Sequence, residues 1–176
     1  MLLLLLKMNY PLDEVVFYDT GMEFQAIYET RDKFLPLLKA KGVKYTELNP
    51  DMPFLYKMFE KPVNGPNGPH FGYSWCGGRC RWGTTEKLKA LEKYCKGATE
   101  YVGLAADEKK RLAKERKGNK SFPLAELGMK ERDCRRYCYK NGIYWEQDAG
   151  AGKKRLYNVL SRVSCWCCGN KNLREL

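Results

Sequence analysis

The sequence has no apolar run long enough to cross a membrane. Residues 1–6 are apolar, but Lys7 ends the run, whereas a membrane span needs about 20 apolar residues. No basic residue precedes the leucines and no Ala-x-Ala-like cleavage site follows them, so the segment also differs from a secretory signal peptide. We therefore expect a cytoplasmic protein that does not contact membranes, with its cysteines reduced or metal-bound.

Histidine is almost absent, because His70 is the only one in the chain. It lies in a stretch rich in proline and glycine, and no orienting partner or nucleophile is recognisable for it. We interpret His70 as a loop residue rather than a catalytic base. The chain also contains no internal repeat.

The composition is that of a globular protein with an excess of positive charge. The chain has 176 residues, of which 44% are hydrophobic and 13% aromatic, and these values indicate one domain with a real core. The formal net charge is +11. Such an excess suits a nucleotide, a nucleic acid or an acidic surface, and a solvated basic surface is the alternative.

The order of the expected elements predicts a parallel α/β sheet. Strand-like runs at residues 15–18, 43–48 and 99–105 alternate with helical patterns. Proline 36 predicts a kink or a break in the first long helix. A proline-rich stretch follows the second strand and predicts a long surface loop. The expected helices are 2–8, 24–41, 84–94 and about 129–141, and the expected loop is 49–73.

Two close-spaced cysteine pairs are the strongest chemical signal. Cys76 and Cys80 form one pair, and Cys165 and Cys168 form the other, with Cys167 as a rival to Cys168. Two such pairs can converge on four tetrahedral thiolate positions, as zinc or an iron–sulfur cluster requires. The alternative is reduced cysteines in a packed core.

The remaining cysteines are more simply explained by packing. Cys134 and Cys138 are four residues apart, so they share one face of a helix. We expect that face to pack on the core rather than to bind a second metal. We expect Cys95 to be structural.

Polar residues follow the first predicted strand, where open parallel sheets bind ligands. Asp19, Thr20 and Gly21 end that strand, and Glu23 lies close enough to orient basic groups. The alternative is a simple strand-to-helix turn in which Asp19 or Thr20 acts as a cap.

Basic residues lie near the first cysteine pair and after the third strand. Arg79, Arg81 and Lys87 belong to the first group, and Arg111 follows Asp107 and Glu108 in the second. We favour Arg79, Lys87 and Arg111 as contacts to phosphate or sulfate. A solvated face is the alternative. The basic stretch 109–120 lacks interleaved aromatic residues, so we expect it to be solvated rather than to bind nucleic acid.

Three stretches together resemble one family. They are VVFYDTGMEF, TEYVGLAADEKKRL, and the tail SRVSCWCCGNKNLREL paired with YSWCGGRCRWGTTEKLK. They resemble a four-cysteine subgroup of the phosphoadenosine-phosphosulfate-reductase-like N-type ATP pyrophosphatases, whose fold is adenine nucleotide alpha-hydrolase-like. The resemblance implies one domain over 1–176, with a Rossmann-like nucleotide-binding part at 1–128 and a helical, cysteine-rich part at 129–176.

The resemblance also implies a ligand set. An adenine nucleotide, either ATP or a sulfonucleotide, would be the substrate, and zinc or a [4Fe-4S] cluster would be held by Cys76, Cys80, Cys165 and Cys168. The nucleotide-binding residues implied are Asp19, Thr20, Gly21, Glu23, Gly103 and Asp107.

One departure from the family bears on activity. The Ser-Gly-Gly-x-Asp-Ser loop that holds pyrophosphate in the family does not occur in this sequence. Residues 1–7 resemble the distal part of the family's first helix, so we expect an N-terminally truncated domain. Such a chain should bind ATP weakly and be inactive or incomplete alone, unless another protein supplies the missing segment.

The family's chemistry is of two sorts. Members reduce a sulfonucleotide with a cysteine nucleophile, or they activate a substrate by adenylation with release of pyrophosphate. This tail lacks the Glu-Cys-Gly-type ending of the reductases, which favours adenylation or sulfur transfer. The alternative function is a non-catalytic, metal-stapled module that binds nucleic acid or a partner.

Overall fold

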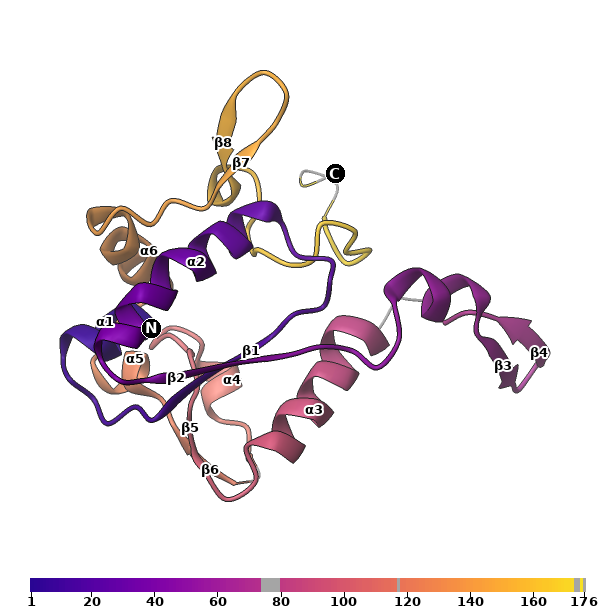
Figure 1. Cartoon of the computed structure of the whole chain (residues 1–176), viewed down its shortest axis with the longest axis horizontal. Helices are drawn as coiled ribbons and strands as arrows, with labels where there is room; N and C mark the ends of the chain where they lie inside the picture. Colours follow the sequence, from indigo (N-terminus) through magenta and orange to yellow (C-terminus); the bar gives the residue numbers. More distant parts are fainter. Residues whose placement is uncertain (74–79, 117, 173–174, 176) are drawn as a thin grey trace. The chain divides into compact units, whose positions relative to one another are not determined.

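The structure is a computed structural model and describes residues 1–73, 80–116, 118–172 and 175. It divides into two units, each built from two stretches of chain. Figure 1 labels the helices and strands of the chain. The α6 unit contains Met1–Asp13 and Glu92–Tyr144, and the cysteine unit contains Glu14–Leu91 and Trp145–Leu176. Both units mix helices with short strands, which confirms the expected α/β class.

The cysteine unit is built on a parallel strand pair. Strand β1 (Glu14–Tyr18) pairs with β2 (Lys44–Leu48), and helix α2 (Gln25–Ala40) connects them. A parallel pair needs such a crossover because a tight turn cannot reverse the chain direction twice. The predictions of both strands and of the intervening helix are confirmed to within about a residue at most ends.

Helix α2 excludes the expected break at Pro36 and corrects the expected inner face of the helix. It runs without a break through Pro36. Ala26 and Leu38, which precede and follow the proline in the helix, are buried. Their packing offsets the free energy lost with the missing backbone hydrogen bond. The helical periodicity of residues 24–41 predicts both Leu37 and Leu38 on the inner face, but the Leu37 side chain is 46% exposed whereas that of Leu38 is 2% exposed.

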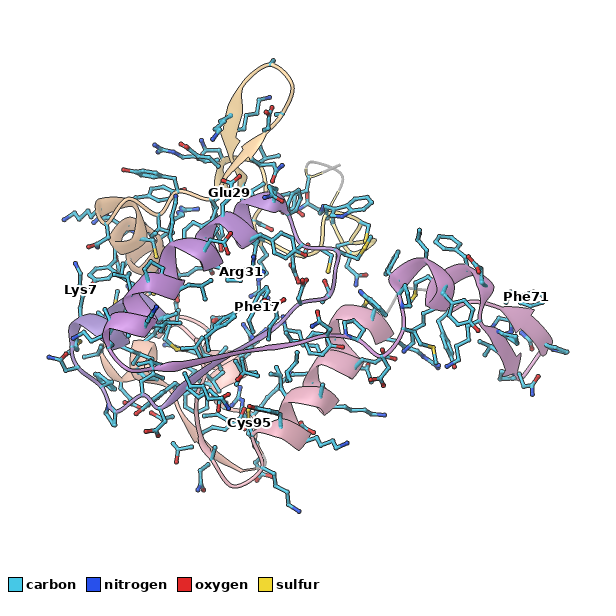
Figure 2. All side chains as sticks on the ribbon, viewed as in Figure 1. Lys7, Phe17, Glu29, Arg31, Phe71 and Cys95 are labelled. Carbon is cyan, nitrogen blue, oxygen red and sulfur yellow. The ribbon has the colours of Figure 1, made fainter. Side chains whose placement is uncertain are left out.

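The expected loop at 49–73 contains regular structure. A π-helical turn η1 (Tyr56–Glu60) precedes the antiparallel hairpin of β3 (Pro62–Gly65) and β4 (Gly68–Phe71). Gly72 follows β4, and Lys61 follows η1. The Gly72 N–H donates to the Lys61 carbonyl at 2.7 Å and so connects the hairpin to η1. A Cβ at Gly72 would lie 1.9 Å from a backbone oxygen, so only glycine fits there. Phe71 extends from the hairpin and is 73% exposed (Figure 2).

The rest of the cysteine unit supplies the segments that carry its chemistry. A π-helical turn η2 (Arg81–Glu86) continues into α3 (Lys87–Tyr94), whose last turn belongs to the α6 unit. The hairpin of β7 (Glu146–Asp148) and β8 (Lys153–Arg155) leads into the 3-10 turn η3 (Leu156–Asn158) and the cysteine-rich tail.

Two buried apolar clusters hold these segments. Ala26 of α2 packs with Leu156 and Leu160, which fixes the start of the tail against the helix. Phe54, Met58 and Trp82 form the second cluster, and Cys80 and Cys167 pack against it. Burial of these side chains is the main favourable term that holds the cysteine-bearing segments in place.

The α6 unit has its own parallel pair. Strand β5 (Thr99–Tyr101) pairs with β6 (Asn119–Ser121). β5 is shorter than the predicted strand 99–105 because the chain turns after it, with the Leu104 N–H donating to the Val102 carbonyl. The helices are α1 (Leu2–Lys7), α4 (Lys109–Leu112), α5 (Pro123–Glu126) and α6 (Glu131–Lys140). Leu4, Leu5 and Leu6 are buried, so the leucine run is core.

The strands of the described residues form four two-stranded sheets. The larger Rossmann-like sheet of the sequence-based prediction is not among them. Among the described helices, none combines the length and the apolar character needed to cross a membrane.

Neighbouring leucines on α2 test the placement of the helix. We expect Leu38→Ala to lower the free energy of unfolding by about 2–5 kcal/mol, because it opens a cavity at a buried position. Leu37→Ala is the matched control and should cost less than about 1 kcal/mol. Urea denaturation followed by circular dichroism measures both. Equal losses for the two variants would show that the inner face of α2 is assigned wrongly.

Candidate functional site

A cavity of about 290 Å³ in the cysteine unit brings together predicted site residues from three segments. Thr20 and Glu23 come from the loop after β1, Lys87 comes from the start of α3, and the cysteines come from both sides. The cysteines that line it are Cys80, Cys165, Cys167 and Cys168. Residues that are far apart in the sequence therefore share one cavity, as the predicted site requires.

The loop after β1 is shaped by its own side chains. The Asp19 carboxylate accepts the N–H of Gly21 at 2.8 Å, and the Thr20 hydroxyl accepts the N–H of Met22 at 3.2 Å. Gly21 has a φ of +72°, which favours glycine. These contacts are those of a strand-to-helix turn. They do not cap α2, whose N-cap residue Phe24 has no side-chain capping bond.

Thr20 links this loop to the tail. Its hydroxyl donates to the Glu23 carboxylate at 3.1 Å, and its oxygen lies 3.5 Å from the Cys165 sulfur. Burial raises the pKa of the Cys165 thiol to about 11, against the lowering effect of the Thr20 hydrogen bond. Without a bound metal, Cys165 is therefore a neutral thiol at pH 7.

The second cysteine pair is presented by a tight turn. The Cys168 N–H donates to the Cys165 carbonyl at 3.0 Å, and the Trp166 N–H donates to the Met22 carbonyl at 3.0 Å. The first contact closes the turn, and the second fixes it to the loop after β1. Burial raises the pKa of the Cys167 thiol, and nearby Cys168 and Cys80 also raise it.

Cys80 lies at the start of η2. The Gly83 N–H donates to its sulfur at 3.3 Å. A backbone donor of this kind stabilises a thiolate once the proton has left. Two residues further on, the Trp82 indole N–H donates to the Thr20 carbonyl at 3.2 Å, which holds η2 against the end of β1.

The donor set has the chemistry of a thiolate metal site, although its ligands are not assembled. Cysteine sulfur suits zinc and iron–sulfur clusters. Within the described ranges, no three His, Cys, Asp or Glu side chains lie close enough to hold a metal ion. The predicted ligand Cys76 and the predicted anion contact Arg79 lie outside the described residues.

Arg81 faces a different cavity from Lys87. That cavity measures about 570 Å³ and is also lined by Lys57, Lys61 and Lys89. The Arg81 guanidinium lies 5.0 Å from the centre of the Tyr73 ring, which is a cation–π contact. Lys87 is thus the predicted cation that the structure places beside the cysteines.

The other predicted nucleotide and anion contacts belong to the α6 unit. Asp107 accepts the N–H of Glu131 at 3.0 Å and so satisfies a donor at the start of α6. Arg111 forms an ion pair with Glu108. Gly103 lies next to the Met1 side chain. A Cβ built at Gly103 would be 3.6 Å from the Met1 sulfur.

The other cysteines in the described residues, and His70, do not line this cavity. Cys134 and Cys138 on α6 are half-buried, and burial raises the pKa of both thiols. Cys95 is half-buried as well. His70 is exposed on β4, with Nδ1 at 3.4 Å from the Gly68 carbonyl.

Trp82 is the residue of this site that sequence reasoning missed. It is 3% exposed, and its ring packs edge-on against Phe54 at 5.4 Å between centroids. The sequence did contain a signal for Trp82, because it lies two residues after Cys80. A large aromatic residue beside a pair of ligands can anchor that pair to a core.

Comparison with models of known protein families, with curated proteins and with solved structures returns no match to this chain.

The Asp19 carboxylate gives the site a measurable pH dependence through Tyr28. The Tyr28 hydroxyl donates to Asp19 at 2.8 Å. Burial first, and then this hydrogen bond, raise the pKa of Tyr28 from 10.0 to about 12. Folding therefore favours the neutral phenol of Tyr28. Its contribution to the free energy of unfolding is fully present below pH 10 and is lost as the pH rises through about 12.

We expect Tyr28 to stay largely protonated at pH 11. The ultraviolet absorbance of tyrosinate, compared between the native protein and Tyr28→Phe, should differ by about a tenth of one phenolate. Circular dichroism confirms that both are folded at that pH. A difference near one full phenolate would contradict the hydrogen bond to Asp19.

Proposed function

We propose that this chain is a nucleotide-binding member of the phosphoadenosine-phosphosulfate-reductase-like family with a thiolate metal site beside its ligand. The shared cavity is the observation that carries the proposal. Thr20 and Glu23 follow the carboxyl end of a parallel strand, where open α/β sheets bind ligands, and they line the same cavity as the cysteines and Lys87. The Rossmann-like sheet is part of the proposal.

Cys80, Cys165 and Cys168 would hold the metal together with Cys76, and Cys167 is the rival to Cys168. Three of these sulfurs already line one cavity. Zinc or a [4Fe-4S] cluster, when bound, would supply a cross-link between η2 and the tail and a positive centre for an anion. The cysteine ligands must lose their thiol protons to bind the metal, so metal binding would release protons.

Lys87 is the proposed contact to the anionic part of the ligand. Its ammonium group is a mobile point charge suited to phosphate or sulfate, and it lines the cavity with Thr20 and Glu23. Asp19 is already engaged by Gly21 and Tyr28. We therefore assign Asp19 to holding the loop in shape beside the adenosine rather than to proton transfer.

The reaction class comes from the family resemblance. It is adenine-nucleotide-dependent sulfur transfer, adenylation or sulfonucleotide reduction. Gly103, Asp107 and Arg111 are proposed as further nucleotide contacts by the family resemblance. Because the family uses both kinds of substrate, sulfonucleotides and ATP are both needed as test ligands.

Cysteine replacements test the metal. Protein purified without oxygen should carry stoichiometric zinc or iron by elemental analysis. Cys165→Ser should lose most of that metal and unfold at a lower temperature, because metal-binding energy is folding energy. Cys95→Ser is the matched control and should keep both. Native protein with neither metal, and with all its thiols freely titratable, would refute the site.

A pair of lysines on α3 tests the anion contact. We expect Lys87→Gln to weaken binding of adenosine 5′-phosphosulfate and of ATP about ten-fold or more, because a hydrogen bond to a charged group is lost. Lys89→Gln removes the same charge from the other cavity and should change affinity less than two-fold. Isothermal titration of metal-loaded protein measures both. Equal weakening would show that net charge alone attracts the ligand.

A further inference from the structure

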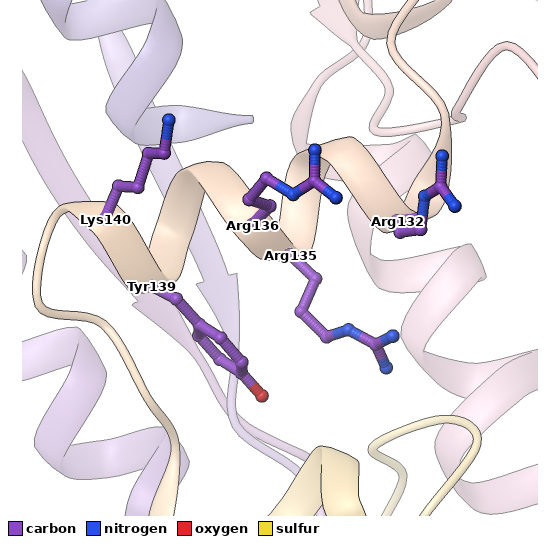
Figure 3. A pocket seen from close by; sticks show the side chains of 5 residues that line it. All are labelled: Arg132, Arg135, Arg136, Tyr139 and Lys140. Carbon is purple, nitrogen blue, oxygen red and sulfur yellow. The ribbon is translucent and has the colours of Figure 1, made fainter.

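Helix α6 carries exposed cations at helical spacing. Arg132, Arg136 and Lys140 are four residues apart in succession, and Arg135 and Tyr139 form a second row beside them. Figure 3 shows the first row pointing to one side of the helix and the second row to another. Neighbours in each row are about 6 Å apart along the helix axis. We call these five residues the arginine face.

The charges of the arginine face are available to a ligand. Arg132, Arg135, Arg136 and Lys140 are all exposed. In the part of the chain that the structure describes, no carboxylate forms an ion pair with any of the four. The face encloses a shallow hollow of about 410 Å³, lined by its five residues. Four cations without a counterion repel one another, so an anion on this face relieves a cost already present in the free protein.

Tyr139 provides a fixed aromatic surface among these cations. Its ring lines the hollow, whereas its hydroxyl oxygen is buried. The Tyr144 ring packs against it with 5.7 Å between centroids. A ring packed along one side loses little conformational entropy when a flat group stacks on it.

This combination distinguishes the arginine face from the other basic segment of the unit. The stretch 109–120 has no aromatic residue, and its Arg111 is paired with Glu108. Affinity for single strands combines a cationic track for phosphates with aromatic rings for unpaired bases. The arginine face has both components and the stretch 109–120 has only the first.

We propose that the arginine face binds single-stranded nucleic acid. The four cations contact successive phosphates, for which arginine offers planar, two-pronged hydrogen bonding. The Tyr139 ring stacks on a base, which is possible only where bases are unpaired. The proposal concerns the α6 unit and stands apart from the nucleotide cavity, so either can fail without the other.

Fluorescence anisotropy with labelled 15-nucleotide oligothymidylate and oligouridylate tests this on the full chain. Four phosphate contacts predict that affinity falls about 50-fold between 50 and 200 mM KCl. The double variant Arg135→Gln, Arg136→Gln should bind about ten-fold more weakly at 50 mM, with a shallower salt dependence. If only one of the two oligomers shows this behaviour, it identifies the strand as DNA or RNA and still supports the face.

The double variant Lys109→Gln, Lys110→Gln is the matched control. It has the same net charge and also changes exposed residues of the α6 unit, and it should keep affinity within two-fold. Equal weakening by the two double variants would overturn the proposal in favour of diffuse attraction by net charge. Oligothymidylate–oligoadenylate duplex or polyglutamate bound as tightly as the single strand would also overturn it.

Further variants separate binding from folding. Arg135→Lys, Arg136→Lys keeps the charges and should keep the salt dependence of the native protein. Tyr139→Phe keeps the ring and should retain binding, whereas Tyr139→Leu should lose about five-fold or more. Circular dichroism and thermal melting establish that each variant is folded. Unchanged binding by folded Tyr139→Leu and by the folded Arg135→Gln, Arg136→Gln variant would refute the face.

Discussion

The buried Trp82 side chain is the constraint on which the cysteine cavity depends. Its indole N–H binds the Thr20 carbonyl at the end of β1, and its ring packs with Phe54 and Met58. Cys80 and Cys167 contact the same cluster from segments that are far apart in the sequence. An indole buries a large apolar area and must find a partner for its N–H, so Trp82 ties the strand end, η2 and the tail together at one point.

The fold brings the cysteines to one cavity independently of the metal that we propose they bind. Apolar burial and backbone hydrogen bonds already place four thiols around one cavity. Burial also holds Cys165 and Cys167 in their neutral forms. A metal would therefore bind to segments that are already close. Its binding would have to offset the cost of removing the thiol protons and of aligning the sulfurs, but not the entropy cost of closing a long loop.

The sequence predicted local structure better than it predicted exposure. Apolar, β-branched runs and a helical pattern between them predicted β1, α2 and β2 to within about a residue, because these signals are local. The helical pattern did not distinguish Leu37 from Leu38, because adjacent residues are only about 100° apart on a helix and tertiary packing decides which of them is buried. Counting prolines in 49–73 predicted a loop, yet the turn residues between Gly65 and Gly68 form a hairpin.

For the candidate site, residue type came from the sequence and proximity came from the fold. The cysteine spacing and the polar strand end were visible directly, because ligand chemistry depends on residue identity. That Thr20 lies 3.5 Å from Cys165, 145 positions along the chain, could not be read from spacing. It depends on where Trp82 and the tail pack. The arginine pattern of α6 was likewise present in the sequence. Only the tertiary structure decided that its cations face outward without carboxylate partners in the described residues, because pairing of charges is set by contacts between distant segments.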